Sequence, residues 1–120
     1  MGNGNSSTEQ FKAQREVLVK ALDEAGRDPE TFPISKRVYI AVDNDEARAE
    51  RRMVEYFGHH YGVAPDRAVQ VSITGSPEKC VEGLMGVIEA GARMLMLNPA
   101  FDYREQMEIL ALEVVPHLKP

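Results

Sequence analysis

The feature that most constrains the fold is a short run, SKRVYIAV, that is apolar on both of its alternating faces. Successive side chains of a strand point to opposite faces, so Val38, Ile40 and Val42 share one face. Tyr39 and Ala41 share the other. A strand that is apolar on both faces is typical of a parallel sheet with helices on each side. The run therefore predicts a buried strand in a parallel α/β sheet.

The rest of the chain alternates helical and strand patterns, which is typical of right-handed βαβ connections. Apolar residues at helical spacing predict helices over Thr8–Ala25, from a cap at Asp43 to near Gly58 or Gly62, from Ser76 to just before Gly91, and from Tyr103 to Leu118. Strands are predicted over residues 35–42, 69–73 and 93–97. We expect the second strand to have one solvent-exposed face. The third strand should end at Asn98-Pro99 and be buried on both faces.

All four helices have an apolar face at helical spacing, and several helix starts have capping signals. The helix that opens at Ser76 is expected to bury Cys80 or Val81, Leu84, Val87 and Ile88. The second helix is expected to bury Ala47, Val54, Phe57 and Tyr61, and the last helix Tyr103, Met107, Leu110, Val114 and Leu118. Ser7 with Gln10 fits a capping box, and so does Asp43 with Glu46. Ser76, followed by proline and glutamate, is a third predicted cap.

The composition argues against nucleic acid as a partner. The chain has 120 residues, a net charge of −5 and 43% hydrophobic residues, which fits one globular domain. Its charges are interspersed, whereas phosphate binding needs clustered lysine and arginine. The arginines that do cluster alternate with glutamates, and we expect a solvated, salt-bridged helix face made of Arg48, Arg51 and Arg52 with Glu46, Glu50 and Glu55.

The predicted location is cytoplasmic. A single cysteine, Cys80, excludes an internal disulfide and suits a reducing compartment. No apolar run approaches the roughly 18 residues that span a bilayer, so no membrane partner is expected. The first ten residues lack the basic and apolar parts of a secretion signal. We expect a disordered polar tail over residues 1–7 and a single domain over residues 8–120.

No metal ligand or catalytic residue is predicted. His59 and His60 are adjacent and point in different directions on a helix, whereas paired metal ligands are usually three or four residues apart. The acidic segment that begins at Asp43 lacks the glycine and the final glutamate of a calcium loop. Cys80 lies near a helix start, which could lower its pKa, but a small core or boundary thiol is the favoured interpretation.

Three residues are candidates for cofactor binding: Gly75, Ser76 and Asn98. In parallel α/β proteins, ligands bind beyond the carboxyl ends of strands, where this chain carries Asp43, Gly75 and the segment from Asn98 to Asp102. The free amides at the helix start could hold an anion. The favoured alternatives are a helix cap at Ser76 and a turn residue before proline at Asn98.

Three segments together resemble the carboxyl-terminal part of luciferase-like flavin-dependent oxidoreductases, namely AGRDPETFPISKRVYIAVDNDEARAERR, GSPEKCVEGL and EAGARMLMLNPAFD. That family includes bacterial luciferase-type monooxygenases and relatives that use the deazaflavin coenzyme. The resemblance runs from about Glu9 to Leu118. It implies that residues 38–42 and 94–97 are the seventh and eighth strands of a (β/α)8 barrel, and that residues 69–73 belong to an insertion between them.

The resemblance also implies an incomplete barrel, because a whole one takes about 250 residues. The portion that supplies most flavin contacts and the usual catalytic residues has no counterpart here. FMN or the deazaflavin coenzyme is the implied cofactor, and we expect the chain alone neither to bind it nor to be active.

Barrel strands without their neighbours leave an unpaired apolar edge. Such strands could form a small three-layer sheet, self-associate, or be marginally stable. We expect a homo-oligomer, or a complex with a chain that supplies the missing barrel strands. The main alternative to an oxidoreductase part is a non-enzymatic α/β interaction module, and a small ligand-binding domain that uses Asn98 has less support.

Overall fold

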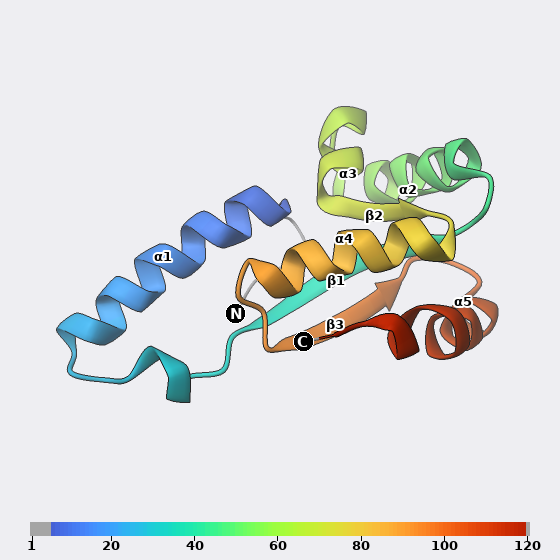
Figure 1. Cartoon of the computed structure of the whole chain (residues 1–120). Helices are drawn as coiled ribbons and strands as arrows, with labels where there is room; N and C mark the ends of the chain where they lie inside the picture. The colour runs from blue at the N-terminus through green and yellow to red at the C-terminus, as the bar shows by residue number, and fades with distance from the viewer. Residues whose placement is uncertain (1–5, 120) are drawn as a thin grey trace.

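A three-stranded parallel sheet forms the centre of the molecule, with helices on both faces (Figure 1). The computed structural model describes residues 6–119. The strands lie in the order β2-β1-β3, with β1 at Ser35–Val42, β2 at Ser72–Gly75 and β3 at Met94–Pro99. The helices are α1 (Thr8–Glu24), α2 (Glu46–Tyr61), α3 (Pro65–Val71), α4 (Pro77–Glu89) and α5 (Tyr103–Ile109), with a 3₁₀ turn at Pro29–Thr31. These elements confirm the predicted α/β class.

The central strand β1 is covered on both edges and both faces. It pairs in parallel with β2 over Tyr39–Val42 and with β3 over Ser35–Ile40. Ile40 and Ala41 are completely buried. The prediction of a buried strand in a parallel sheet is therefore confirmed.

Each face of the sheet has its own hydrophobic core. On one face Val38, Ile40 and Val42 contact α4, the start of α1 and the turns that follow α5. On the other face Tyr39 and Ala41 contact α2 and α3. The connection from β1 to β2 therefore runs over one face, and the connection from β2 to β3 runs over the other.

The segment 69–73 is mostly helical, which corrects the predicted strand. α3 begins at Pro65, a residue favoured in the first helical turn. Ala68 and Val71 are buried three residues apart, whereas Val69 is 40% exposed. A short run of alternating apolar residues is compatible with either a strand or a helix. Here packing against α2 favours the helix. The strand begins only at Ser72.

The strand β3 is longer and less covered than predicted. Asn98 and Pro99 do not stop it, because both pair with β1. Proline is tolerated on an edge strand, where one side needs no ladder bond. Met94 and Met96 are 64% and 55% exposed, so the expectation of full cover is wrong. They lie on the Tyr39 face, where α2 and α3 pack mainly against β1 and β2.

The helix α2 has a different cap and a different buried face from those predicted. Asp45, not Asp43, is the N-cap, and its carboxylate accepts the Arg48 backbone N–H at 3.1 Å. The buried stripe is Ala49, Met53 and Phe57. Residues four apart form one ridge on a helix, and this ridge faces the sheet. Of the predicted face only Phe57 is fully buried, Val54 is partly buried, and Ala47 and Tyr61 are exposed.

The last helical segment is interrupted, so its predicted stripe is buried only in part. α5 continues into a π turn over Leu110–Val114 and a 3₁₀ turn over Val115–His117. A π turn rotates the following residues relative to the preceding helix face. Leu110 and Val114 are buried, whereas Tyr103 and Met107 are 61% and 62% exposed.

The other predicted caps are confirmed. Ser7 and Gln10 form a capping box, and Ser76 caps α4 ahead of a proline. Of the predicted polar tail, residues 1–5 lie outside the described residues. Ser6 is buried, and its C=O accepts a hydrogen bond from the buried Lys36 ammonium at 3.1 Å. Within residues 6–119, no helix is both long and apolar enough to cross a membrane.

Candidate functional site

A cavity of about 270 Å³ opens at the carboxyl ends of β1 and β3. The two other strands flank β1 on opposite sides, so the direction of strand addition reverses there. In open α/β sheets such a reversal creates a crevice that is the usual ligand site. The polar lining comes from the end of β1, the first half of α2, the loop that leads into α5 and α5 itself, and it includes Asp43, Arg48, Arg52, Asp102 and Gln106.

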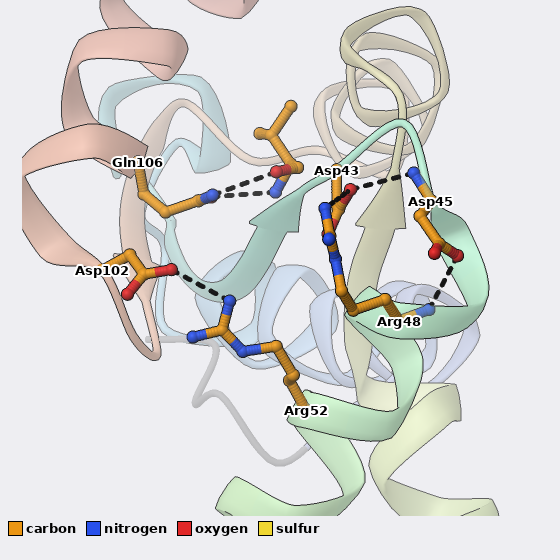
Figure 2. A network of polar contacts seen from close by, with 7 residues as sticks. Asp43, Asp45, Arg48, Arg52, Asp102 and Gln106 are labelled. Atoms are coloured by element: carbon orange, nitrogen blue, oxygen red, sulfur yellow. Dashed lines mark hydrogen bonds and ion pairs between the residues drawn. The ribbon is translucent and has the colours of Figure 1, made fainter.

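Asp43 and Arg48 form a two-point ion pair directly after β1 (Figure 2). Arg48 Nε donates to Asp43 Oδ2 at 2.7 Å, and a terminal guanidinium N–H donates to Oδ1 at 2.8 Å. The Asp45 backbone N–H also donates to Oδ1. The hydrogen bond from Arg48 holds the pKa of Asp43 below its ordinary value, in spite of partial desolvation. Asp43 is therefore a fixed carboxylate at the rim of the cavity.

Arg52 lies one helical turn further along α2 and crosses to the opposite wall. Its Nη1 donates to Asp102 Oδ2 at 2.9 Å (Figure 2). Its guanidinium carbon lies 3.7 Å from the centre of the Phe101 ring, which is a cation–π contact. Asp102 has φ = 48°, in the left-handed region that non-glycine residues rarely adopt. These contacts tie the loop after β3 to α2.

Gln106 occupies the position of a missing strand at the end of β1. Its Oε1 accepts the Val42 N–H at 2.8 Å, and its Nε2 donates to the Val42 C=O at 3.0 Å (Figure 2). Gln106 is only 6% exposed. The side-chain amide thus satisfies both backbone groups of a buried residue that lies beyond the last β1–β3 pair.

The arginine cluster pairs differently from the sequence-based prediction. Arg48 and Arg52 form ion pairs with the strand-end aspartates rather than with glutamates of the same helix. One of those glutamates, Glu46, pairs with Lys79 of α4. Asp43 and Asp102 follow parallel strands, which all end at the same edge of the sheet. The two aspartates therefore lie closer to Arg48 and Arg52, respectively, than the glutamates of α2 do.

The three predicted cofactor-binding residues lie near this edge but do not line the cavity. Gly75 pairs with Val42, has φ = 129°, and accepts the Asp43 N–H at 2.7 Å. Ser76 accepts the Lys79 N–H at 3.3 Å as the cap of α4. Asn98 pairs with Tyr39, three residues before the end of β1. β1 therefore separates Asn98 from the other two.

The remaining candidate groups are structural. Cys80 is completely buried, and burial raises the pKa of its thiol to about 12, which confirms a core thiol. His59 and His60 lie in the last turn of α2, and the His60 ring stacks on Tyr56. In the part of the chain that the structure describes, no three residues of the types that bind metals are grouped to hold an ion.

The cavity is lined mainly by charged side chains that donate or accept hydrogen bonds. Its described lining contains no cysteine, histidine, lysine, serine or tyrosine. Two guanidinium groups and four carboxylates line it, the carboxylates being those of Asp43, Asp102, Glu105 and Glu113, with the Phe101 ring beside Arg52. Such a set can orient a polar, planar ligand by hydrogen bonds.

Sequence reasoning missed Arg52 and Gln106 as members of this site. The expectation that ligands bind beyond the carboxyl ends of strands did mark Asp43 and the segment from Asn98 to Asp102, which includes Phe101. A buried glutamine in the first turn of the last helical segment has no periodic signal of its own. Only the register of β1 against β3 shows that Val42 needs a partner there.

Comparisons with known proteins identify the fold. No family model matches the chain, and no curated protein matches it either. A solved F420-dependent secondary alcohol dehydrogenase, in complex with an F420-acetone adduct, superposes with a TM-score of 0.81 at 17% identity. The coenzyme F420-dependent tetrahydromethanopterin reductase from Methanopyrus kandleri superposes with a TM-score of 0.70, also at 17% identity.

These alignments cover almost all of this chain but less than half of either protein. The first covers 97% of this chain and 42% of the dehydrogenase, and the second covers 95% and 44% of the reductase. The predicted resemblance is therefore confirmed at the level of the fold, including its partial extent. The chain therefore has the fold of part of a (β/α)8 barrel, as found in these two proteins.

Proposed function

We propose that the chain is the carboxyl-terminal part of a luciferase-like oxidoreductase that uses a deazaflavin or flavin coenzyme, and that it is inactive alone. The observation that carries the proposal is the unequal coverage, in which 97% of this chain matches 42% of an F420-dependent dehydrogenase. The deazaflavin is favoured over FMN because both solved structures described above depend on F420. A reducing, cytoplasmic setting belongs to the proposal, since Cys80 is a free thiol.

The cavity after β1 and β3 would contribute polar contacts to the site of the whole enzyme. Arg48 and Arg52 carry more N–H donors than their ion pairs use, and Asp43 and Asp102 carry further acceptor positions. A planar heterocycle with alternating C=O and N–H groups suits this set. When bound, the coenzyme would supply hydride chemistry, and these residues would orient it.

The size of the cavity explains why the chain alone is expected to be inactive. Ligand pockets enclose roughly 300–1,000 Å³, and this cavity of about 270 Å³ is below that range. The remainder of a barrel would have to complete it. Gly75, Ser76 and Asn98 remain proposed cofactor contacts. The coenzyme titration described next tests them as well.

The proposal is tested by titrating the purified chain with coenzyme F420 and, separately, with FMN. Fluorescence should show no stoichiometric binding at micromolar concentrations. Amide NMR spectra at millimolar F420 should show weak shifts confined to the cavity, around Asp43, Arg52 and Gln106. Arg52→Ala should remove these shifts, whereas Arg51→Ala, on the same helix but not on the cavity wall, should not.

Three outcomes would contradict the proposal or the site that it assigns. Tight stoichiometric binding would show that the chain alone is a complete cofactor-binding unit. No cavity shifts at millimolar coenzyme would remove the assigned site. Shifts centred on Asn98 or Ser76 instead, lost in Asn98→Ala or Ser76→Ala, would move the site to the residues predicted from sequence.

The second candidate function is an interaction module without enzymatic activity. It is favoured by one observation, the exposed apolar strand β3 at an edge of the sheet. A chain that binds neither coenzyme but forms a defined complex through β3 would fit this alternative better.

A further inference from the structure

A second, smaller cavity of about 40 Å³ lies at the amino ends of β1 and β2, at the opposite end of the sheet from the candidate cofactor site. Its lining comes from the residues that open α1, the first half of β1, the junction of α3 with β2, and one residue of α4. Among the described residues, Lys36 is the only ionisable side chain in this lining. Lys36 is 3% exposed, and lysines are almost never buried to this extent.

The amino group of Lys36 lies at the start of α1. Its Nζ donates to the Ser6 C=O at 3.1 Å and to the Arg37 C=O at 3.0 Å. Ser6 directly precedes Ser7, the N-cap of the helix. The amino end of a helix carries a partial positive charge, so a cation is disfavoured there and an anion is stabilised. Burial disfavours the cation as well and lowers the pKa of Lys36 to about 8.

The first turn of α1 has backbone donors that the helix itself does not use. The Ser7 hydroxyl accepts the Gln10 N–H at 3.2 Å, and the Ser7 C=O accepts the Phe11 N–H at 2.9 Å. The N–H groups of Thr8 and Glu9 lie between them, where no helical carbonyl can accept them. Thr8 lines the cavity, whereas the Glu9 side chain is exposed and does not. The cavity therefore combines a buried amine with backbone donors that suit an anion.

We propose that Lys36 is a carbamylation site, at which the uncharged amine adds carbon dioxide and the first-turn N–H groups of α1 hold the resulting carbamate. The amine nitrogen attacks the carbon of carbon dioxide, and a C–N bond forms. One C=O π bond opens to give the carboxylate, and the nitrogen loses one proton to solvent, so no oxidant or reductant is needed. The reaction replaces a disfavoured cation with an anion at the start of α1. It does not depend on the proposed function.

The size of the cavity and the charge of the product favour carbon dioxide over other electrophiles. A cavity needs roughly 10–15 Å³ to hold one water molecule, so about 40 Å³ leaves room for only a few non-hydrogen atoms. Carbon dioxide fits this space, whereas a sugar or a coenzyme aldehyde is too large. A small aldehyde would give an imine, which has no negative charge for the backbone N–H groups of α1 to hold.

The test is to incubate the chain with ¹³C-labelled bicarbonate and carbon dioxide at pH 8. Carbamates are then trapped by alkylation with a trialkyloxonium ion and located by peptide mass spectrometry. Lys36 should be labelled about tenfold or more above Lys20, which is exposed on α1. The reason is that at pH 8 the uncharged fraction of a lysine is about a hundredfold higher at a pKa of about 8 than at 10.5. Labelling of Lys36 no higher than that of Lys20 would overturn the inference.

Two substitutions of Thr8 test the contact with α1. Proline is favoured at the first helical position, and Ser7, with ψ = 168°, has the extended conformation that a residue before proline adopts. Thr8→Pro removes one N–H donor and should lower the labelling of Lys36 by about fivefold. Thr8→Ala keeps the N–H and should keep the labelling. Circular dichroism checks that both variants are folded, and equal labelling in the two would overturn the assigned role of α1.

Discussion

At the scale of single residues, Gln106 shows how one side chain can complete a sheet. β3 diverges from β1 after Pro99, which leaves the Val42 N–H and C=O without a strand partner. The buried amide of Gln106 bonds to both groups. A buried backbone group without a partner costs about 1–3 kcal/mol, so this residue should matter for stability as well as for the cavity.

Replacing Gln106 by leucine should therefore destabilise the chain strongly. We expect Gln106→Leu to lower the free energy of unfolding by roughly 2–4 kcal/mol, since it orphans one buried donor and one buried acceptor. Urea unfolding followed by circular dichroism measures the change. Arg104→Leu is the control, because the Arg104 side chain is 93% exposed. Equal stability of the two variants would contradict the assigned role.

Lys36 should make stability depend on pH. Burial lowers the pKa of Lys36 from 10.5 to about 8. Between these values the unfolded chain holds a proton that the folded chain has lost, so the free energy of unfolding rises with pH. We expect a rise of about 1 kcal/mol between pH 7 and 9, measured by urea unfolding. Lys36→Met should abolish it, and an unchanged slope in that variant would refute the assignment.

Cys80 should be chemically inert while the chain is folded. Burial first, and then the charge of Glu46, raise the pKa of its thiol from 9.0 to about 12. At pH 8 the thiolate fraction is then about a thousandfold lower than in the unfolded chain. Ellman's reagent should react only after urea is added. Rapid labelling of the folded chain would show that the α4 core opens readily.

At the scale of elements, α4 offers two glycines with opposite expected effects. A Cβ at Gly86 would meet no atom within 4 Å, whereas one at Gly83 would lie 3.1 Å from Ile73 Cγ2. Alanine at an open helical position gains about 0.5–1 kcal/mol relative to glycine. Gly86→Ala should raise the melting temperature. Gly83→Ala, the matched variant on the same helix, should raise the melting temperature less or lower it. A higher melting temperature for Gly83→Ala than for Gly86→Ala would show that β2 does not pack closely on α4.

Element type was predictable wherever local pattern and tertiary packing agreed. β1, α1 and α4 follow directly from a two-sided apolar run and from well-formed caps at Ser7 and Ser76. The strand predicted over residues 69–73 was wrong because its apolar spacing suits both a strand and a short helix, and contact with α2 selected the helix. The buried stripe predicted for the last helix was wrong in part because the π turn at Leu110–Val114 changes the helical period.

At the scale of the whole molecule, the unpaired edge of β3 dominates the expected behaviour, because the missing strands of the proposed barrel would fill it. Without those strands, the expected homo-oligomer would link folding to association, so that stability depends on concentration. The melting temperature should then rise with protein concentration in differential scanning calorimetry. Met96→Lys on β3 should remove this dependence, whereas Val17→Lys on α1, where Val17 is 72% exposed, should keep it. A melting temperature independent of concentration in the unmodified chain would argue against self-association and favour a chain that supplies the missing strands.

The sequence by itself determined the α/β class, the central strand and the likeness in fold to part of a (β/α)8 barrel. These properties reside in local periodicity, caps and ordered motifs, which neighbouring residues specify. Only the tertiary structure decided that Arg52 pairs with Asp102 and that Gln106 completes β1. The reason is physical: these partners are 50 and 64 residues apart, and strand register, which no local pattern encodes, brings them together.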